Sequence, residues 1–138
     1  MEKAKTTEPQ TISDLETPTV LIDLDRLDAN LRKTAELAKK ANVKLRPHIK
    51  THKSKWIAKQ QLRYGASGIT VAKLGEAEVM ADAGIEDILI AYPIVGRKKL
   101  QRLGELMNRV KITVSTDNLQ VAQGLSDLGE SLRLNIPV

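Results

Sequence analysis

The regular alternation of short apolar runs with helical patterns limits the possible folds of this chain more than any other feature. Six runs rich in β-branched and aliphatic residues occur at 20–23, 43–47, 69–72, 88–91, 112–114 and 132–136. Runs of this length and composition are typical of buried parallel strands. Because helical patterns separate them, the sequence predicts an α/β fold with right-handed crossovers.

Capping residues mark the helices that we expect between these strands. Apolar residues at helical spacing follow a possible Asp25 cap, and similar patterns cover 54–64 and 117–128. Gly65, Gly84 and Gly129 follow the last periodic residues of three patterns, as helix C-caps commonly do. Residues 1–14 are polar and aperiodic, so we expect a flexible tail there.

Six strands suit either a complete doubly wound sheet or the front part of a (β/α)8 barrel. Length alone favours the doubly wound sheet, because a barrel needs about 250 residues and this chain has 138. The absence of dinucleotide and P-loop fingerprints weakens that interpretation. Since nothing follows the last strand, we expect a fold that continues beyond this chain and exposes apolar positions around Val71, Ile90 and Val114.

Composition indicates a soluble, cytoplasmic protein. The chain is 41% hydrophobic and 28% charged, which permits a real core and argues against disorder. No apolar run approaches the roughly 20 residues that span a bilayer, and the charged start does not resemble a signal peptide. The net charge of +5 permits an anionic ligand, a cofactor phosphate or nucleic acid without selecting among them.

Both histidines lie in one basic stretch, R-P-H-I-K-T-H-K, which begins at Arg46. On a strand, Arg46, His48 and Lys50 would point to one face, and Leu45 and Ile49 to the other. Neighbouring cations and partial desolvation both disfavour an ammonium ion, so Lys50 is a candidate amine for imine formation. A solvated basic strand end is the alternative, since lysines are mostly exposed.

Metal and nucleic-acid binding fit this stretch poorly. Residues four apart on an extended chain are separated by roughly 13 Å, so His48 and His52 cannot share a zinc ion whose ligands lie at about 2 Å. Trp56 is the only aromatic residue nearby, and no stacking platform accompanies it. We therefore predict no metal ligands in this chain and no nucleic-acid partner.

Tyr92 directly follows the apolar run at 88–91 and precedes a proline. The carboxyl ends of parallel strands are where α/β enzymes build their sites. Lys73 and Thr116 occupy equivalent positions after two other strands. These three residues are candidate contacts of a ligand, and solvent-facing loop residues are the alternative.

Several motifs together resemble the N-terminal half of D-threonine aldolases and eukaryotic-type D-serine dehydratases, which are alanine racemase-like, fold-type III enzymes. The resemblance covers about residues 15–138 and is carried by the segments at 17–23, 46–53, 68–78, 83–85 and 87–93. The P-H-x-K-T-H-K element is its most specific part. The resemblance as a whole implies a partial (β/α)8 TIM barrel with about five barrel strands and an N-terminal leader strand at 20–23. The remaining barrel strands and a β domain would lie outside this chain.

The resemblance also implies a site. The lysine of the P-H-x-K element forms the Schiff base with pyridoxal 5'-phosphate (PLP) in that family, and here it is Lys50, whereas Lys53 is not the Schiff-base position. We expect His48 and His52 as candidates for proton transfer, and Arg46 and Tyr92 as further cofactor contacts. A divalent metal is implied for the full-length enzyme, with ligands outside this chain.

The function implied is a lyase acting on a D-amino acid, first of all retro-aldol cleavage of D-threonine. The alternatives are D-serine dehydratase or another D-amino acid deaminase, and a non-catalytic, truncated PLP-binding domain. We expect no membrane partner, and a homodimer for the full-length enzyme.

Overall fold

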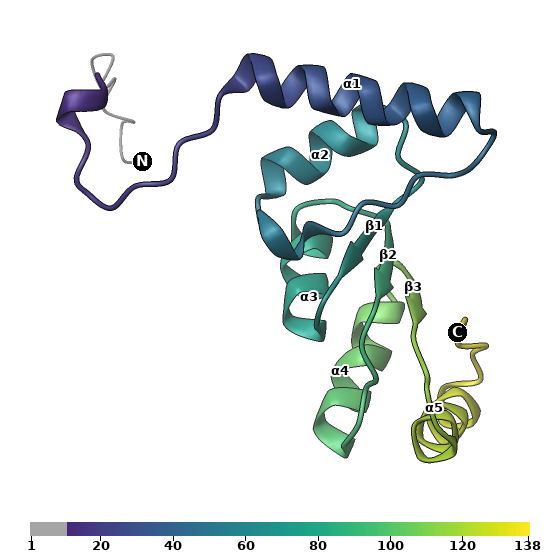
Figure 1. Ribbon diagram of the computed structural model, residues 1–138. Helices are drawn as coiled ribbons and strands as arrows, with labels where there is room; N and C mark the ends of the chain where they lie inside the picture. Colours follow the sequence, from purple (N-terminus) through teal and green to yellow (C-terminus); the bar gives the residue numbers. More distant parts are fainter. Residues whose placement is uncertain (1–10) are drawn as a thin grey trace.

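A parallel three-stranded sheet forms the centre of residues 11–138, the part of the chain that the computed structural model describes. The strands are β1 (Ile69–Val71), β2 (Asp87–Ile90) and β3 (Lys111–Val114), in that order. Each is followed by a helix, α3 (Leu74–Asp82), α4 (Arg97–Met107) and α5 (Leu119–Leu132) (Figure 1). The predicted α/β class is confirmed, and consecutive βα units of this kind are consistent with part of a TIM barrel.

The sheet buries one of its two faces in an aliphatic core. Val71, Ile90 and Val114 are 0%, 0% and 1% exposed and belong to one cluster with apolar residues of α3, α4 and α5. The expectation that these positions are exposed is therefore wrong, because they point toward the helices. Strand alternation places Thr70 and Leu89, which are partners in the register, on the opposite face.

Two further helices precede the sheet, α1 (Leu24–Lys40) and α2 (Lys55–Arg63). The side chain of Asp23, and not of Asp25, caps α1 by accepting a hydrogen bond from the Arg26 amide. Tyr64 at the end of α2 donates a hydrogen bond to Asp28 on α1, which ties the two helices together. In Figure 1, α1 crosses above α2, and the chain before α1 extends away from the sheet.

Two of the expected strands, 20–23 and 43–47, are not strands in the structure. Val20 and Leu21 are exposed and lead into α1 without a partner strand. The second segment does lie along β1, since the Thr70 amide donates to the Pro47 carbonyl at 2.7 Å and His48 forms a bridge with Thr70. Pro47 has no N–H to donate, which limits the pairing to isolated contacts.

The expected strand at 132–136 is also wrong, because α5 continues through Gly129 to Leu132. A Cβ on Gly129 would lie 2.9 Å from the Leu134 carbonyl oxygen, so glycine lets the chain turn back against its own helix. The returning segment reaches β3, where the Val114 amide donates to the Pro137 carbonyl at 3.0 Å. Residues 11–138 thus contain three strands in place of the expected six.

The predicted tail, 1–14, falls mostly on residues 1–10, which lie outside the described residues. The rest of it contains one 3-10 turn, η1 (Ile12–Asp14). The side chain of Asp14 accepts hydrogen bonds from the amide and hydroxyl of Thr11, and these bonds lower the pKa of that carboxyl.

Candidate active site

Lys50 lies in a short 3-10 turn, η2 (Ile49–Thr51), between the extended segment and α2. Ile49 anchors the turn because its side chain is fully buried in the core, while Lys50 beside it is exposed. The bridge between His48 and Thr70 places the backbone of Lys50 at the carboxyl end of the sheet, beside the residue that follows β1. Strand alternation therefore ends at His48, and a helical turn presents Lys50.

Both histidines use Nδ1 to hold the backbone of this region. His48 Nδ1 accepts from the Lys50 amide at 3.2 Å, and His52 Nδ1 accepts from the Ser54 amide at 3.0 Å. These bonds leave the proton of each neutral ring on Nε2. Burial lowers the pKa of His52, with Gln61 acting weakly in the opposite direction. The expected role of either histidine in proton transfer would thus use Nε2 and stays a prediction.

Lys53 has a different environment from Lys50. Its backbone is left-handed, with φ of 49°, and its Nζ lies 3.5 Å from Oε1 of Glu76 on α3. The other carboxylate oxygen of Glu76 accepts a hydrogen bond from the Ala72 amide at 2.8 Å. Among the described residues, Lys50 takes part in no ion pair. Of the two motif lysines, Lys50 is the one whose amine is unengaged.

Arg46 lies at the opposite end of the sheet from Lys50. Its Nη1 contacts Asp87 Oδ1 at 2.7 Å, and Lys111 Nζ lies 3.1 Å from the other oxygen of that carboxylate. The hydrogen bond from Arg46 is the main reason that the pKa of Asp87 is lowered. Gly68 lies between them, and a Cβ there would be 2.4 Å from Arg46 Nη1. The Arg46 guanidinium thus forms an ion pair with Asp87 inside the protein. A direct contact between Arg46 and a cofactor stays a prediction.

Tyr92 is exposed at the carboxyl end of β2, where it lines a cavity of about 500 Å³. The cavity also reaches Lys73, Lys99 and Arg102, which give it a positive wall. Arg102 is engaged by Glu78, with its Nε 2.8 Å from Oε1. The predicted rim residues Lys73 and Tyr92 therefore meet at one cavity, and Lys99 is a neighbour that the sequence did not point to.

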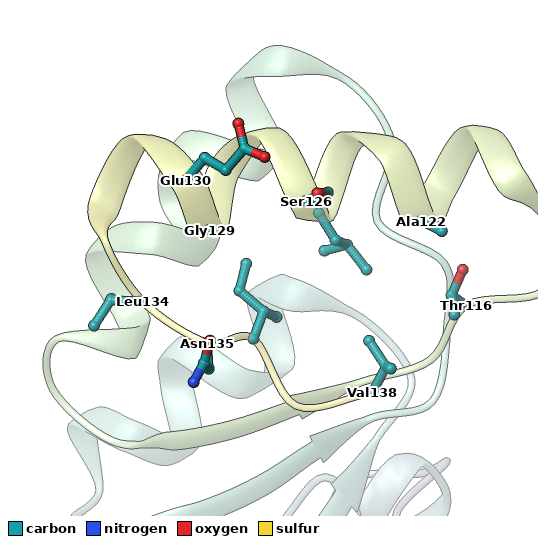
Figure 2. A pocket seen from close by; sticks show the side chains of 10 residues that line it. Thr116, Ala122, Ser126, Gly129, Glu130, Leu134, Asn135 and Val138 are labelled. Atoms are coloured by element: carbon teal, nitrogen blue, oxygen red, sulfur yellow. The ribbon is translucent and has the colours of Figure 1, made fainter.

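A second cavity, of about 380 Å³, lies between α5 and the returning segment 134–138 (Figure 2). Thr116, the third predicted rim residue, lines it together with Ser126 and Glu130. None of the residues of the basic stretch reaches this cavity, so Thr116 does not share a cavity with Lys73 and Tyr92.

Two negative findings apply to residues 11–138. No group of three or more His, Cys, Asp or Glu side chains is placed to hold a metal ion within this range. None of its helices combines the length and the apolar composition needed to cross a membrane.

Besides Lys99, sequence reasoning missed Glu76, which lies near the Lys50 turn, and Asp87, which lies at the opposite end of the sheet. Each holds one of the motif cations from a distant part of the chain, Glu76 from α3 and Asp87 from β2. The sequence carries only a weak signal for these two residues. Asp87 directly precedes one predicted strand and Glu76 follows another by four residues, but their positions do not show which cation each carboxylate binds.

The amino-acid sequence is similar to those of several known lyases. The chain is 39% identical over 131 residues to a D-threonine aldolase of Arthrobacter sp., covering 92% of this chain and 35% of the relative. It is 37% identical to a D-threo-3-hydroxyaspartate dehydratase of Delftia sp. (strain HT23), covering 86% of this chain and 31% of the relative. A D-serine dehydratase of Dictyostelium discoideum is 31% identical, with coverage of 84% and 30%.

Solved structures of such enzymes share the fold. A D-threonine aldolase from Filomicrobium marinum superposes with a TM-score of 0.86 at 41% identity, over 91% of this chain and 34% of that one. The chain spans about a third of the length of the curated relatives that it matches. The family described as alanine racemase, N-terminal domain, matches residues 22–138. The chain therefore belongs to the alanine racemase N-terminal domain family.

Proposed function

We propose that these residues form the lysine-bearing part of a PLP-dependent lyase for D-amino acids, with retro-aldol cleavage of D-threonine as its reaction. The observation that carries the proposal is the contrast between two lysines of one motif. Lys50 is exposed and unengaged among the described residues, whereas Lys53 is paired with Glu76. A cofactor aldehyde needs a free primary amine at the site, and Lys50 supplies one.

The described residues fit the chemistry of such a cofactor at its aldehyde end. His48 Nδ1 accepts a hydrogen bond from the Lys50 amide, and the buried Ile49 fixes the turn, so the backbone that carries Lys50 is held in place. Lys73 and Lys99 give positive charge to the cavity at the carboxyl ends of β1 and β2, which Lys50 does not itself line, and this charge suits an anionic cofactor or a substrate carboxylate. When bound, PLP supplies the electron sink for a bond broken at Cα of the substrate.

Sequence identity supports cleavage of D-threonine over dehydration of D-serine. The chain is 39% identical to a D-threonine aldolase and 31% identical to a D-serine dehydratase. Cleavage of D-threonine removes the hydroxyl proton, breaks the Cα–Cβ bond and adds a proton to Cα, giving acetaldehyde and glycine. The second candidate is dehydration of a D-3-hydroxy amino acid, which the 37% identity to a D-threo-3-hydroxyaspartate dehydratase supports.

A divalent metal and a homodimer belong to the proposal for the full-length protein. A related structure shows a D-threo-3-hydroxyaspartate dehydratase in a metal-free form, which supports a metal for the full-length protein. As the family resemblance implies, we propose that the ligands of this metal lie outside this chain.

The lysine assignment is tested by Lys50→Ala and Lys53→Ala in the full-length protein. We expect borohydride reduction in the presence of PLP to leave a cofactor adduct on Lys50, which is lost in Lys50→Ala and kept in Lys53→Ala. Lys55→Ala is the matched control, because Lys55 is an exposed lysine of the same basic region. An adduct mapped to Lys53, with none at Lys50, would contradict the assignment.

The reaction is tested by turnover of D-threonine, D-serine and D-threo-3-hydroxyaspartate with PLP and a divalent metal, with L-threonine as the stereochemical control. Acetaldehyde and glycine from D-threonine support the aldolase. Ammonia from either of the other substrates, with no acetaldehyde, would replace it by the dehydratase, and no turnover at all would favour a non-catalytic role.

A further inference from the structure

The side chain of Glu76 is the only buried charged group among residues 11–138, at 9% exposed. Both of its oxygens are used. Oε2 accepts a hydrogen bond from the Ala72 amide at 2.8 Å, and Oε1 lies 3.5 Å from Lys53 Nζ. A buried carboxylate is costly unless it is paired and hydrogen-bonded, so these two contacts account for its presence.

These contacts connect three pieces of the fold. Ala72 follows β1, Glu76 lies in the first turn of α3, and Lys53 follows the turn that carries Lys50. The Lys53 amide also donates to the Ile49 carbonyl at 2.8 Å, which closes that turn. A single carboxylate thus links the end of β1 to the Lys50 turn.

We propose that Glu76 is a positioning residue for Lys50. It holds Lys53, and through Lys53 the Ile49–Thr51 turn, at the carboxyl end of β1, where the Lys50 amine must meet its reaction partner. The inference rests on the proposed role of Lys50 and adds a residue and an ion pair to it. Small displacements of a reacting group slow a reaction by large factors. The Glu76–Lys53 ion pair should therefore affect the reactivity of Lys50 more than the stability of the fold.

The two contacts of Glu76 contribute differently. The Lys53 side chain is 60% exposed, and exposed ion pairs are weak. The bond from the Ala72 amide is protected within the protein and charge-assisted, which makes it the stronger contact. Glutamine at position 76 can keep the bond to Ala72 and lose the ion pair, whereas alanine loses both. The variants therefore separate the two contacts.

The test follows the rate at which Lys50 reacts with PLP in the full-length protein after removal of bound cofactor. The Lys50 amine adds to the aldehyde carbon and one water leaves, and borohydride then delivers hydride to the C=N bond. Mass spectrometry measures the adduct on Lys50. Hydrogen exchange of the Ala72 amide and of residues 50–54 is recorded on the same samples.

We expect Glu76→Gln and Lys53→Met each to slow adduct formation on Lys50 by about three- to tenfold, an effect typical of a misplaced reacting group. The double variant should be no slower than either single one, because both remove the same ion pair. Lys53→Arg should restore the rate. Glu76→Ala, unlike Lys53→Met, should also accelerate exchange of the Ala72 amide.

Asp82→Asn is the matched control, because Asp82 is another α3 carboxylate, paired with Arg109 away from the turn. Rates for Glu76→Gln and Lys53→Met equal to that of Asp82→Asn would overturn the positioning role. If Glu76→Gln does not fold, the comparison of Lys53→Met with Lys53→Arg still tests the positioning role of the ion pair. Absence of any Lys50 adduct in the unaltered protein would instead refute the proposed function, so the two failures are distinguishable.

Discussion

Asp87 offers the sharpest test of the electrostatics, because it bridges two cations on one face of the sheet. Its Oδ1 lies 2.7 Å from Arg46 Nη1 and its Oδ2 lies 3.1 Å from Lys111 Nζ. The carboxylate is 23% exposed and the Arg46 side chain 26% exposed, so this pair is only partly screened by solvent. Asp87→Asn removes the negative charge and keeps one acceptor oxygen.

The expected loss follows from the two contacts. A hydrogen bond to a charged group contributes about 1.5–3 kcal/mol, of which asparagine retains part. Lys111 is 67% exposed, so its pair contributes less than about 1 kcal/mol. We therefore expect Asp87→Asn to lower the free energy of unfolding by about 1–2 kcal/mol at pH 7.

The pH dependence has a definite sign. Because Arg46 lowers the pKa of Asp87 in the folded protein, the carboxylate stabilises the fold above its unfolded pKa of about 3.9. That contribution is lost as the pH falls through the lower folded value. The difference between Asp87→Asn and the unaltered protein should thus be constant from about pH 5 to 8 and shrink below about pH 4.

The assay is urea denaturation followed by circular dichroism at pH 7 and pH 3. Asp82→Asn is the control, because its partner Arg109 and Asp82 itself are at least half exposed, and we expect it to cost less than about 0.5 kcal/mol. Equal losses for the two variants, or a loss for Asp87→Asn that persists unchanged at pH 3, would refute this account.

Three further predictions concern packing, and urea denaturation tests the stability of each variant. Gly68→Ala should destabilise the protein by about 1–3 kcal/mol, because the new Cβ would lie 2.6 Å from the Asp87 backbone oxygen. Gly104→Ala should be nearly neutral, because its 2.7 Å contact is the flexible tip of Leu132 and alanine favours the helix by about 1 kcal/mol. Ile49→Ala should cost about 2–5 kcal/mol and slow the reaction of Lys50 with PLP, since this side chain is fully buried. Equal losses of stability for Gly68→Ala and Gly104→Ala would contradict the predictions for the glycines. An unchanged rate of the Lys50 reaction in Ile49→Ala would contradict the prediction for Ile49.

Local signals in the sequence determined most of the helices. Ser54 caps α2 through a bond to the Ile57 amide, and Gly65 and Gly84 take the left-handed backbone expected after α2 and α3. The alternating apolar runs correctly predicted the three strands of the sheet. These features depend on residues close together in the chain, which is why the sequence alone reveals them. The P-H-x-K element likewise pointed to the family that the comparisons confirm.

Where local signals in the sequence misled, the neighbours in space decided the structure. The extended chain at 43–47 has a strand-like composition, but it makes only isolated contacts with β1. Gly129 looks like a helix stop, yet α5 continues through it, and the glycine instead makes room for the Leu134 carbonyl of the returning chain. The direction of the Val71 and Ile90 side chains also depended on where the helices packed. A short strand that is apolar throughout does not show in its sequence which of its faces meets the helices.

The partners of the charged residues were decided by the tertiary structure alone. The sequence placed Arg46, Lys50 and Lys53 in one basic stretch and could not say which of them would be neutralised. Folding brings Asp87 to Arg46 and Glu76 to Lys53, from β2 and α3, and leaves Lys50 unpaired among the described residues. Such ion pairs depend on which strand and helix ends meet, and no local pattern encodes that meeting.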